Sequence, residues 1–471
     1  MDMKPKRRVQ SLKSKQQFNG KKFMMKTATV GLLLNMLMFS AVPAMAEGEV
    51  TPTATVAPAS AATGSAVKIP SVESLGLDLS SAVLIEPTTG QVLLSLNADQ
   101  PLPPASMTKM MTEYLVADAV KNGKISWDQK VIVPLNAAKQ IGSRIFLAEG
   151  DEHTVEELYI AMAVGSANDA TVALAELVGG SEEAFVGMMN ETAQKMGMKT
   201  AYFINSTGLN REDMPAEFRP DTDKETVMSA MDAAILAKYI VTDHPDFTRF
   251  TTIQSYKFRP RDKKPMINYN WMLEANKDNV NFKAYAYPGL DGLKTGHTQN
   301  AGNCFTGTAV RDGMRLISVV MGANSEAHRF TETKKVLDFG FNNFEIKQVI
   351  APKVVLAGNE TVPVLKGKKK DVSVVTDEGV TFIVPKGTTN PQITTTVQVN
   401  DPATLVAPIA QGSVVGKVSY SYQGEGIAQV QQKTVNLITS EEAEKAGWFK
   451  LLFRAIGDFL SDLFNGIKNL F

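Results

Sequence analysis

The sequence predicts an α/β or α+β domain, then a small all-β domain and an amphipathic helix at the C-terminus. Strand patterns at 81–96 and at 303–321 bracket a helical middle section, so strands from both ends of the first domain are expected to share one sheet. After about Glu345, Val, Thr, Gly and Pro dominate, which is typical of short strands and turns. The 471 residues suffice for two or three domains.

Local patterns justify each element in turn. Residues 81–96 form a predicted hairpin, because two apolar runs flank the turn signal at 87–90. A helix is predicted over 106–120, and Thr154 with Glu157 makes a capping box before a second helix at 158–164. The remaining patterns predict helices at 182–196, 229–241 and 334–344, and strands at 303–310, 315–321, 372–375 and 394–399.

The N-terminus has the pattern of an export signal. A long basic region precedes an uncharged, mostly apolar run at 27–42, and Ala44-Met45-Ala46 supplies the small residues of a cleavage site. An uncleaved anchor is the alternative, but the run is shorter than the ~20 residues that span a bilayer. We therefore expect a signal peptide at 1–46, and a linker at 47–70 because that segment is rich in Thr, Ala, Pro and Ser.

The C-terminal segment 448–471 carries apolar residues at helical spacing, with charged and polar residues on the opposite face. A helix docked on the protein's own core is one interpretation. The density of large apolar and aromatic groups instead favours a helix lying flat in a lipid interface. The predicted domain limits are therefore 71–344 for the first domain, 345–437 for the all-β domain and 438–471 for the membrane-anchor helix.

Composition excludes several classes of function. Forty-nine basic residues balance forty-nine acidic ones, so no basic excess indicates nucleic-acid binding. The single cysteine, Cys304, rules out an intramolecular disulfide, and no Cys/His cluster has metal-ligand spacing, so neither a metal nor a cofactor is expected. Four histidines leave a Ser-His-Asp hydrolase open by count, but the G-x-S-x-G elbow of many such enzymes is absent.

The first motif with chemical content is Ser106-Met107-Thr108-Lys109. Three residues along a helix return to nearly the same face, so the amine of Lys109 is expected to reach the hydroxyl of Ser106. A serine becomes a good nucleophile only when a base takes its proton, and a lysine can do this only if its pKa is lowered. The motif alone is weak, because an accidental copy occurs at 65–68.

Two further motifs follow in order. Ser166-Ala167-Asn168 comes after Gly165, in a break between helical runs, where it could also be a simple helix cap. Lys294-Thr295-Gly296 is predicted to lie on a strand, with the glycine leaving room for the backbone of a substrate. Lys294 adds a second positive charge that would lower the pKa of Lys109, so two ammonium groups are expected to converge on the Ser106 hydroxyl.

The combination is far more specific than its parts. Serine-x-x-lysine, serine-x-asparagine and lysine-threonine-glycine, in this order, occur in penicillin-binding proteins and class A β-lactamases. The segments 104–109, 165–170, 205–209 and 292–298 resemble the low-molecular-mass penicillin-binding proteins, the D-alanyl-D-alanine carboxypeptidases. The resemblance covers about 81–344 and extends to the β-rich domain with its terminal helix. Ala167 stands where that family often has glycine.

The resemblance implies a transpeptidase/β-lactamase-like fold, with a central antiparallel sheet of five strands and helices on both sides. It implies that Ser106 attacks the penultimate D-Ala carbonyl and that Lys109 is the general base. The other implied roles are proton transfer to the leaving amine by Ser166, a substrate amide contact by Asn168, carboxylate binding by Lys294, Thr295 and Arg329, and an oxyanion hole from the backbone N–H groups of Ser106 and His297. The His297 side chain is expected to be structural.

The resemblance also implies the partners and the location. A peptidoglycan stem peptide would be the substrate, and β-lactam antibiotics would acylate Ser106 and leave slowly. The protein would be secreted and bound peripherally to the outer face of the bacterial cytoplasmic membrane. No nucleic-acid partner is expected.

Two alternatives stay open at this point. A serine β-lactamase has the same motifs, but its Glu-x-x-Leu-Asn deacylation pattern is missing from 210–220, where Glu212 and Glu217 are the candidate bases. A non-enzymatic protein that senses cell wall is the second alternative, although every motif side chain is intact. Transpeptidase and endopeptidase activities would share the same acyl-enzyme.

Overall fold

A computed structural model describes residues 68–424, 426–427 and 429–468. The predicted signal peptide and residues 47–67 of the predicted linker lie outside the described residues. The described chain begins with a 3₁₀ turn, η1 (Val72–Leu75), that leads into the first strand.

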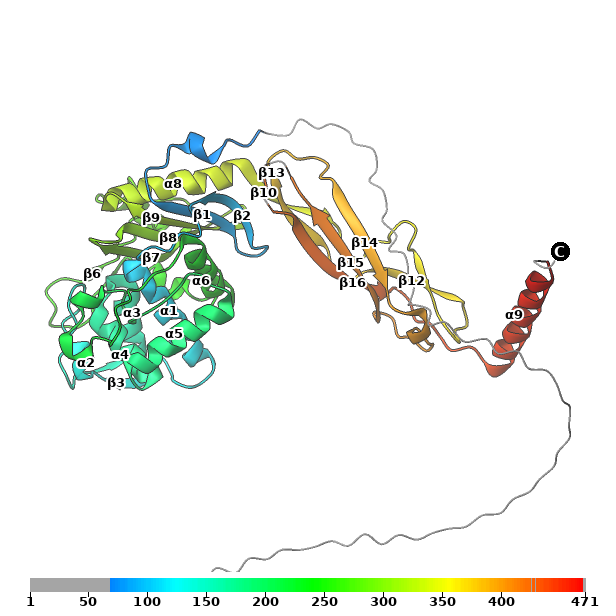
Figure 1. Cartoon of the computed structure of the whole chain (residues 1–471), viewed down its shortest axis with the longest axis horizontal. Helices are drawn as coiled ribbons and strands as arrows, with labels where there is room; N and C mark the ends of the chain where they lie inside the picture. The colour runs from blue at the N-terminus through cyan, green and yellow to red at the C-terminus, as the bar shows by residue number, and fades with distance from the viewer. Residues whose placement is uncertain (1–67, 425, 428, 469–471) are drawn as a thin grey trace, which may run out of the picture. The chain divides into compact units, whose positions relative to one another are not determined.

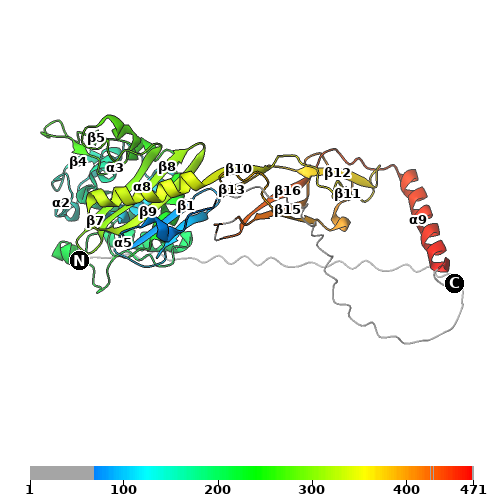
Figure 2. The same ribbon diagram turned by 90° about the horizontal axis from the view of Figure 1, so that it is seen from above.

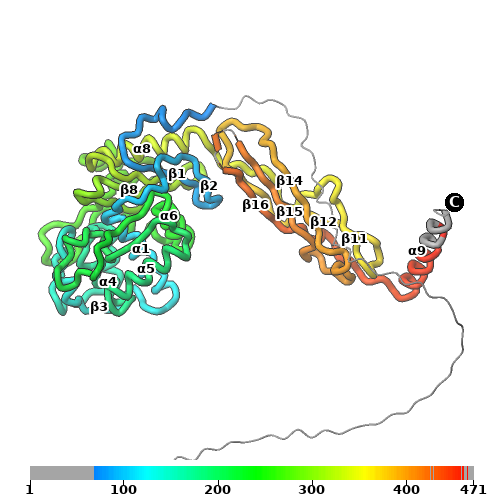
Figure 3. Tube along the Cα trace, viewed as in Figure 1, coloured from blue at the N-terminus to red at the C-terminus, as the bar shows by residue number. Residues whose placement is uncertain are grey.

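The first domain is built on a five-stranded antiparallel sheet with the strand order β2-β1-β9-β8-β7. Strand β1 pairs with β9, so segments more than 220 residues apart in sequence lie side by side (Figures 1 and 3). The predicted shared sheet and the hairpin are confirmed. The strands of the five-stranded sheet are β1 (Ser81–Glu86), β2 (Gln91–Leu96), β7 (Leu290–Thr298), β8 (Gly302–Arg311) and β9 (Met314–Ala323).

Helices cover both faces of this sheet. Strand β1 is buried along its whole length, and its side chains alternate, with Leu84 in the apolar cluster on one face and Val83 in the cluster on the other. Each such buried aliphatic side chain contributes about 2 kcal/mol. Helix α8 (Glu326–Asn343) packs on the first face (Figures 1 and 2), and α6 (Ala230–Asp243) packs on the second (Figure 1).

The helical middle section follows the predictions closely. The capping box of Thr154 is present at the start of α3, and α5 has the predicted bounds. The helices of this section are η2 (Ala105–Thr108), α1 (Lys109–Lys121), α2 (Leu135–Ala138), α3 (Val155–Gly165), α4 (Asn168–Gly179), α5 (Glu182–Met196), η3 (Arg211–Asp213), η4 (Ala216–Phe218), α7 (Thr248–Thr251) and η5 (Glu274–Asp278). Two small hairpin sheets join β3 (Lys130–Ile132) to β4 (Glu152–Thr154) and β5 (Ser255–Tyr256) to β6 (Met266–Ile267).

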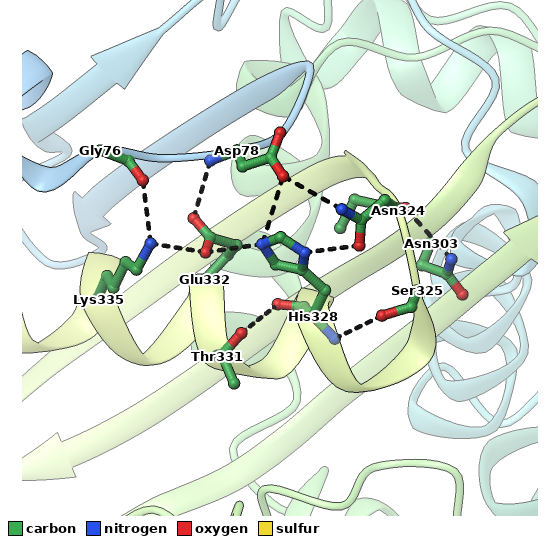
Figure 4. Close-up of polar contacts among 10 residues, drawn as sticks. Gly76, Asp78, Asn303, Asn324, Ser325, His328, Thr331, Glu332 and Lys335 are labelled. Carbon is green, nitrogen blue, oxygen red and sulfur yellow. Dashed lines mark hydrogen bonds and ion pairs between the residues drawn. The ribbon is translucent and has the colours of Figure 1, made fainter.

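Helix α8 begins eight residues before the predicted start at 334. The prediction missed its first two turns because they are mostly polar and show little of the apolar periodicity that indicates a helix. A polar cluster fixes these turns against the segment that precedes β1 (Figure 4). The backbone N–H of Asp78 donates to Glu332 Oε2 at 3.1 Å, and His328 Nε2 contacts Glu332 Oε1 at 2.9 Å. Lys335 pairs with the same carboxylate at 2.8 Å. The cluster therefore anchors the part of α8 that carries Arg329.

The C-terminal residues form two sheets, one of β10 with β13 and one with the order β11-β12-β16-β15-β14. The predicted all-β character is confirmed, and β16 runs two residues past the predicted end at 437. The strands are β10 (Phe344–Ile350), β11 (Thr361–Pro363), β12 (Asp371–Thr376), β13 (Val380–Pro385), β14 (Ile393–Val399), β15 (Val414–Tyr422) and β16 (Gln431–Thr439), with a short η6 (Pro402–Thr404).

The predicted terminal helix is present as α9 (Trp448–Lys468). Its large apolar side chains are exposed, among them Phe453 at 70%, Phe459 at 66% and Phe464 at 73%. Within the described ranges, no helix combines the length and the apolar character that a membrane crossing requires.

Candidate active site

The first motif lies at the junction of η2 and α1, which packs against β7. Lys109 Nζ donates to Ser106 Oγ at 3.0 Å and to the Thr207 carbonyl at 2.8 Å. Ser106 sits in the 3₁₀ turn, whereas a regular α-helix is predicted there, and the hydroxyl and the amine still meet. The Lys109 side chain is completely buried, so the amine that touches the serine is removed from water.

The second motif lies where α3 gives way to α4, as the predicted break indicates. Ser166 is the residue after α3 and adopts a left-handed conformation with a φ of 53°. This backbone turn carries its hydroxyl to Lys294, whose Nζ donates to Ser166 Oγ at 2.9 Å. The two lysines therefore donate to two different hydroxyls, Lys109 to Ser106 and Lys294 to Ser166, and the charge of Lys294 still acts on Lys109.

Asn168 begins α4 and is almost fully buried. Its Nδ2 donates to the Ile141 carbonyl at 2.6 Å, and its Oδ1 is buried without a hydrogen-bond partner among the described residues. A buried amide oxygen without a partner is costly. The free oxygen is thus the part of Asn168 that has capacity for a further donor.

The third motif runs along β7, next to η2. An added Cβ on Gly296 would lie 2.4 Å from the Pro104 carbonyl oxygen and 3.2 Å from the backbone nitrogen of Met107. From the sequence, we expect the backbone of a substrate to approach at this position. In the structure, backbone atoms of Pro104 and Met107 lie where a side chain of residue 296 would be. The glycine allows β7 to approach the serine-bearing turn, which brings the strand of Lys294 and Thr295 beside Ser106.

Two other predicted site residues lie on or against β7. Arg329 of α8 is 2% exposed, and its Nη1 donates to the Gly296 carbonyl at 3.3 Å. The His297 side chain is exposed, and its Nδ1 contacts the Gly302 carbonyl of the neighbouring strand at 3.0 Å. All nine predicted site residues therefore belong to η2, α1, the junction of α3 and α4, β7 or the start of α8.

A family model described as D-alanyl-D-alanine carboxypeptidase matches residues 67–325, more than half of the chain. The chain belongs to the D-alanyl-D-alanine carboxypeptidase family. A second family model, described as the C-terminal domain of penicillin-binding protein 5, matches residues 344–445.

Relatives of the carboxypeptidase cover most of its length. The D-alanyl-D-alanine carboxypeptidase DacF of Bacillus subtilis (strain 168) is 36% identical over 386 residues, which are 82% of this chain and 91% of the relative. The crystal structure of a peptidoglycan synthesis regulatory factor (PBP3) from Streptococcus pneumoniae is 31% identical, covers 78% of this chain and 100% of its own, and has a TM-score of 0.66. Penicillin-binding protein 5 from Haemophilus influenzae is 30% identical, with shares of 78% and 98% and a TM-score of 0.61.

These comparisons confirm the predicted family, fold class and activity. The chain is a serine D-Ala-D-Ala carboxypeptidase with an all-β C-terminal domain. The β-lactamase alternative is not favoured, because the matching family model and the curated relatives are carboxypeptidases. Among the residues that the structure describes, no group of three or more His, Cys, Asp or Glu side chains is arranged to hold a metal ion.

The electrostatics of the carboxypeptidase site centre on the two lysines. Burial lowers the pKa of Lys109 well below its ordinary value, and the positive charge of Lys294 lowers that pKa further. Burial also lowers the pKa of Lys294, while the carboxyl group of Glu113 opposes that shift. The predicted effect of the second positive charge on the pKa of Lys109 is therefore present, and it favours the neutral form of the Lys109 amine.

Three contributors to the site were missed in the sequence interpretation. The carbonyl that Lys109 binds belongs to Thr207, and a backbone atom leaves no side-chain signal. Asp169 accepts hydrogen bonds from the backbone N–H groups of Ile145 and Leu147, which secures the loop facing Asn168. Glu113 lies one turn after Lys109 on α1 and is 3% exposed. An acidic residue at i+4 from the lysine, inside an apolar run, was the signal for Glu113.

Proposed function

We propose that Ser106 is the nucleophile that removes the terminal D-alanine from peptidoglycan pentapeptides, with Lys109 as its general base. The supporting observation is the 3.0 Å contact between Lys109 Nζ and Ser106 Oγ, made by a fully buried lysine whose pKa is lowered. The neutral amine takes the hydroxyl proton as Ser106 attacks the carbonyl of the penultimate D-Ala. The tetrahedral intermediate then collapses to an acyl-enzyme, and water hydrolyses it.

The other predicted residues are proposed to transfer the proton and to stabilise the intermediate. Ser166, held by Lys294 at 2.9 Å, would pass the proton to the leaving amine. The backbone N–H groups of Ser106 and His297 would stabilise the oxyanion, because fixed dipoles cost no reorganisation during the reaction.

The substrate itself would be held by a second set of groups. Asn168 would bind the substrate amide through its unpaired Oδ1. Lys294 and Thr295 would bind the terminal carboxylate, with the positive charge of Arg329 behind the strand at Gly296.

The proposal predicts a covalent, slowly released penicillin adduct. Nitrocefin is expected to give a burst of hydrolysis that stalls near one equivalent, while D-Ala is released catalytically from a diacylated Lys-D-Ala-D-Ala peptide. Mass spectrometry of the penicillin-treated protein should locate the adduct on Ser106. Sustained rapid nitrocefin turnover would instead point to a β-lactamase, and no D-Ala release together with an unlabelled Ser106 would contradict the proposal.

We further propose the predicted division of the chain. It comprises a signal peptide at 1–46, a linker at 47–70, a catalytic domain at 71–344, an all-β domain at 345–437 and an anchor segment at 438–471. The end of α8 at Asn343 supports the boundary between the two folded domains. The first residues of the proposed anchor segment contact the β domain, since an isolated bridge joins Ala443 to Ile409.

We propose that α9 holds the secreted protein on the outer face of the cytoplasmic membrane. Deleting 448–471 is expected to leave D-Ala release unchanged and to abolish sedimentation with phospholipid vesicles. Replacing Phe453, Phe459 and Phe464 by serine should weaken vesicle binding at least about 100-fold, because each aromatic ring loses a favourable transfer into lipid. The control Val355→Ser removes an exposed apolar group of the β domain and should bind normally. Unchanged sedimentation of the truncated protein would refute the anchor.

A further inference from the structure

One carboxyl group inside the catalytic domain has no part in the proposed chemistry. Glu113 lies on α1 one helical turn after Lys109, so both side chains leave the helix on the same side. Its side chain is 3% exposed, and within the described part of the chain its Oε1 is buried without a hydrogen-bond partner. A carboxyl group in such a place is costly unless its surroundings compensate for the lost water. Burial raises the pKa of Glu113 to about 7, and the positive charges of Lys294 and Lys109 oppose that rise, so the carboxyl group is ionised above about pH 7.

The charged surroundings of Glu113 are few and mostly positive. Lys109 faces it from its own helix and Lys294 from β7, and both lysines are almost completely buried. Tyr159 faces it from α3, where the hydroxyl donates to the Glu113 carbonyl at 3.2 Å. Asp169 on α4 acts on Lys109. Neither lysine forms an ion pair with Glu113, so the groups interact through the field of a buried, weakly screened pocket.

We propose that Glu113 is a positioning residue for proton transfer, a buried counter-charge that keeps Lys294 protonated while Lys109 is neutral. The inference rests on the proposed roles of the two lysines. With Glu113 ionised, Lys294 charged and Lys109 neutral, the three groups carry no net charge, which is the least costly state for a buried pocket that needs one base and one cation. Without the carboxylate, the same state carries one uncompensated positive charge.

The influence of Glu113 differs between the lysines, which supports this arrangement. For Lys294, Glu113 is the strongest charged neighbour and raises the pKa against burial. For Lys109, the strongest charged neighbour is Lys294, which lowers the pKa, and Glu113 comes after it. The carboxylate thus favours a charged Lys294, and the charged Lys294 favours a neutral Lys109. When the surroundings of two titratable groups push their pKa values apart, one site can contain both an acid and a base.

The test is the pH profile of kcat/KM for D-Ala release by Glu113→Gln. The acid limb reports loss of the Lys109 proton, and the alkaline limb reports loss of the Lys294 proton. Removing a negative charge lowers the pKa of both lysines, so both limbs should move to lower pH, the alkaline limb by on the order of one unit. At alkaline pH, KM should rise more than kcat falls, because the neutral Lys294 no longer binds the substrate carboxylate.

Two matched variants separate charge from packing. Glu113→Asp keeps the charge and should leave both limbs near their wild-type positions. Tyr159→Phe removes the hydroxyl bonded to the Glu113 carbonyl without changing charge near neutral pH and should do the same. Equal shifts in the aspartate and glutamine variants, or no shift in the glutamine variant, would overturn the inference.

A further measurement covers the case in which Glu113→Gln does not fold. In the wild-type protein, carbon-13 spectra of labelled glutamate should show an ionised Glu113 carboxyl group at the pH of maximal activity. A protonated Glu113 under those conditions would overturn the inference without any variant. Failure of the proposed function itself would look different, because the wild-type Ser106 would then take up no labelled penicillin.

Discussion

Ser106→Ala is expected to abolish covalent labelling by penicillin and to lower kcat/KM for D-Ala release by at least about 10⁴-fold. The acyl-enzyme requires an oxygen at this position. The buried Lys109 amine lies 3.0 Å from the Ser106 hydroxyl and is proposed to activate it, and alanine removes that hydroxyl. Residual activity would come only from substrate binding and the oxyanion hole, since no nucleophile remains.

The chain contains its own controls for this experiment. Ser65 and Ser95 stand in accidental copies of the first two motifs, at 65–68 and 95–97. Their alanine variants should label and turn over like the wild type. Lys109→Arg keeps Ser106 but replaces the base with a group that stays protonated, so labelling should become slow rather than vanish. A Ser106→Ala protein that still forms a stoichiometric penicillin adduct would assign the nucleophile elsewhere.

The sequence predicts those parts of the site that depend on local pattern. The hairpin, the capping box at Thr154 and the bounds of α5 follow from periodicity and turn chemistry. The three motifs indicate Ser106 and Lys294 as candidate site residues before any fold is known. What depends on long-range packing is not predicted. The 2.8 Å contact of Lys109 with the Thr207 carbonyl joins residues 98 positions apart.

The start of α8 and the role of Gly296 also depend on long-range packing, so the sequence alone does not predict them. The first turns of α8 are polar because they bind the segment before β1, so the apolar period begins only near 334. Gly296 was correctly identified as a close-approach position, but a sequence cannot tell whether substrate or the protein's own backbone makes the approach. The structure shows the Pro104 carbonyl there. The close packing of Gly296 against this carbonyl therefore has a testable consequence.

Gly296→Ala is expected to lower the free energy of unfolding by about 2–4 kcal/mol and to reduce penicillin acylation at least about 100-fold. The new Cβ would lie 2.4 Å from the Pro104 carbonyl oxygen, a backbone atom that cannot rotate away, so β7 must move from the serine-bearing turn.

The movement would carry Lys294 with it and break the alignment of the two lysine–serine pairs. Denaturant unfolding and the rate of labelling by fluorescent penicillin measure the two effects. The matched control is Gly187→Ala on α5, where an added Cβ meets nothing within 4 Å. There the change should be neutral or stabilising by up to about 1 kcal/mol, because alanine favours the helix. If Gly296→Ala behaved like this control, the contact between β7 and η2 would not be what sets the geometry of the site.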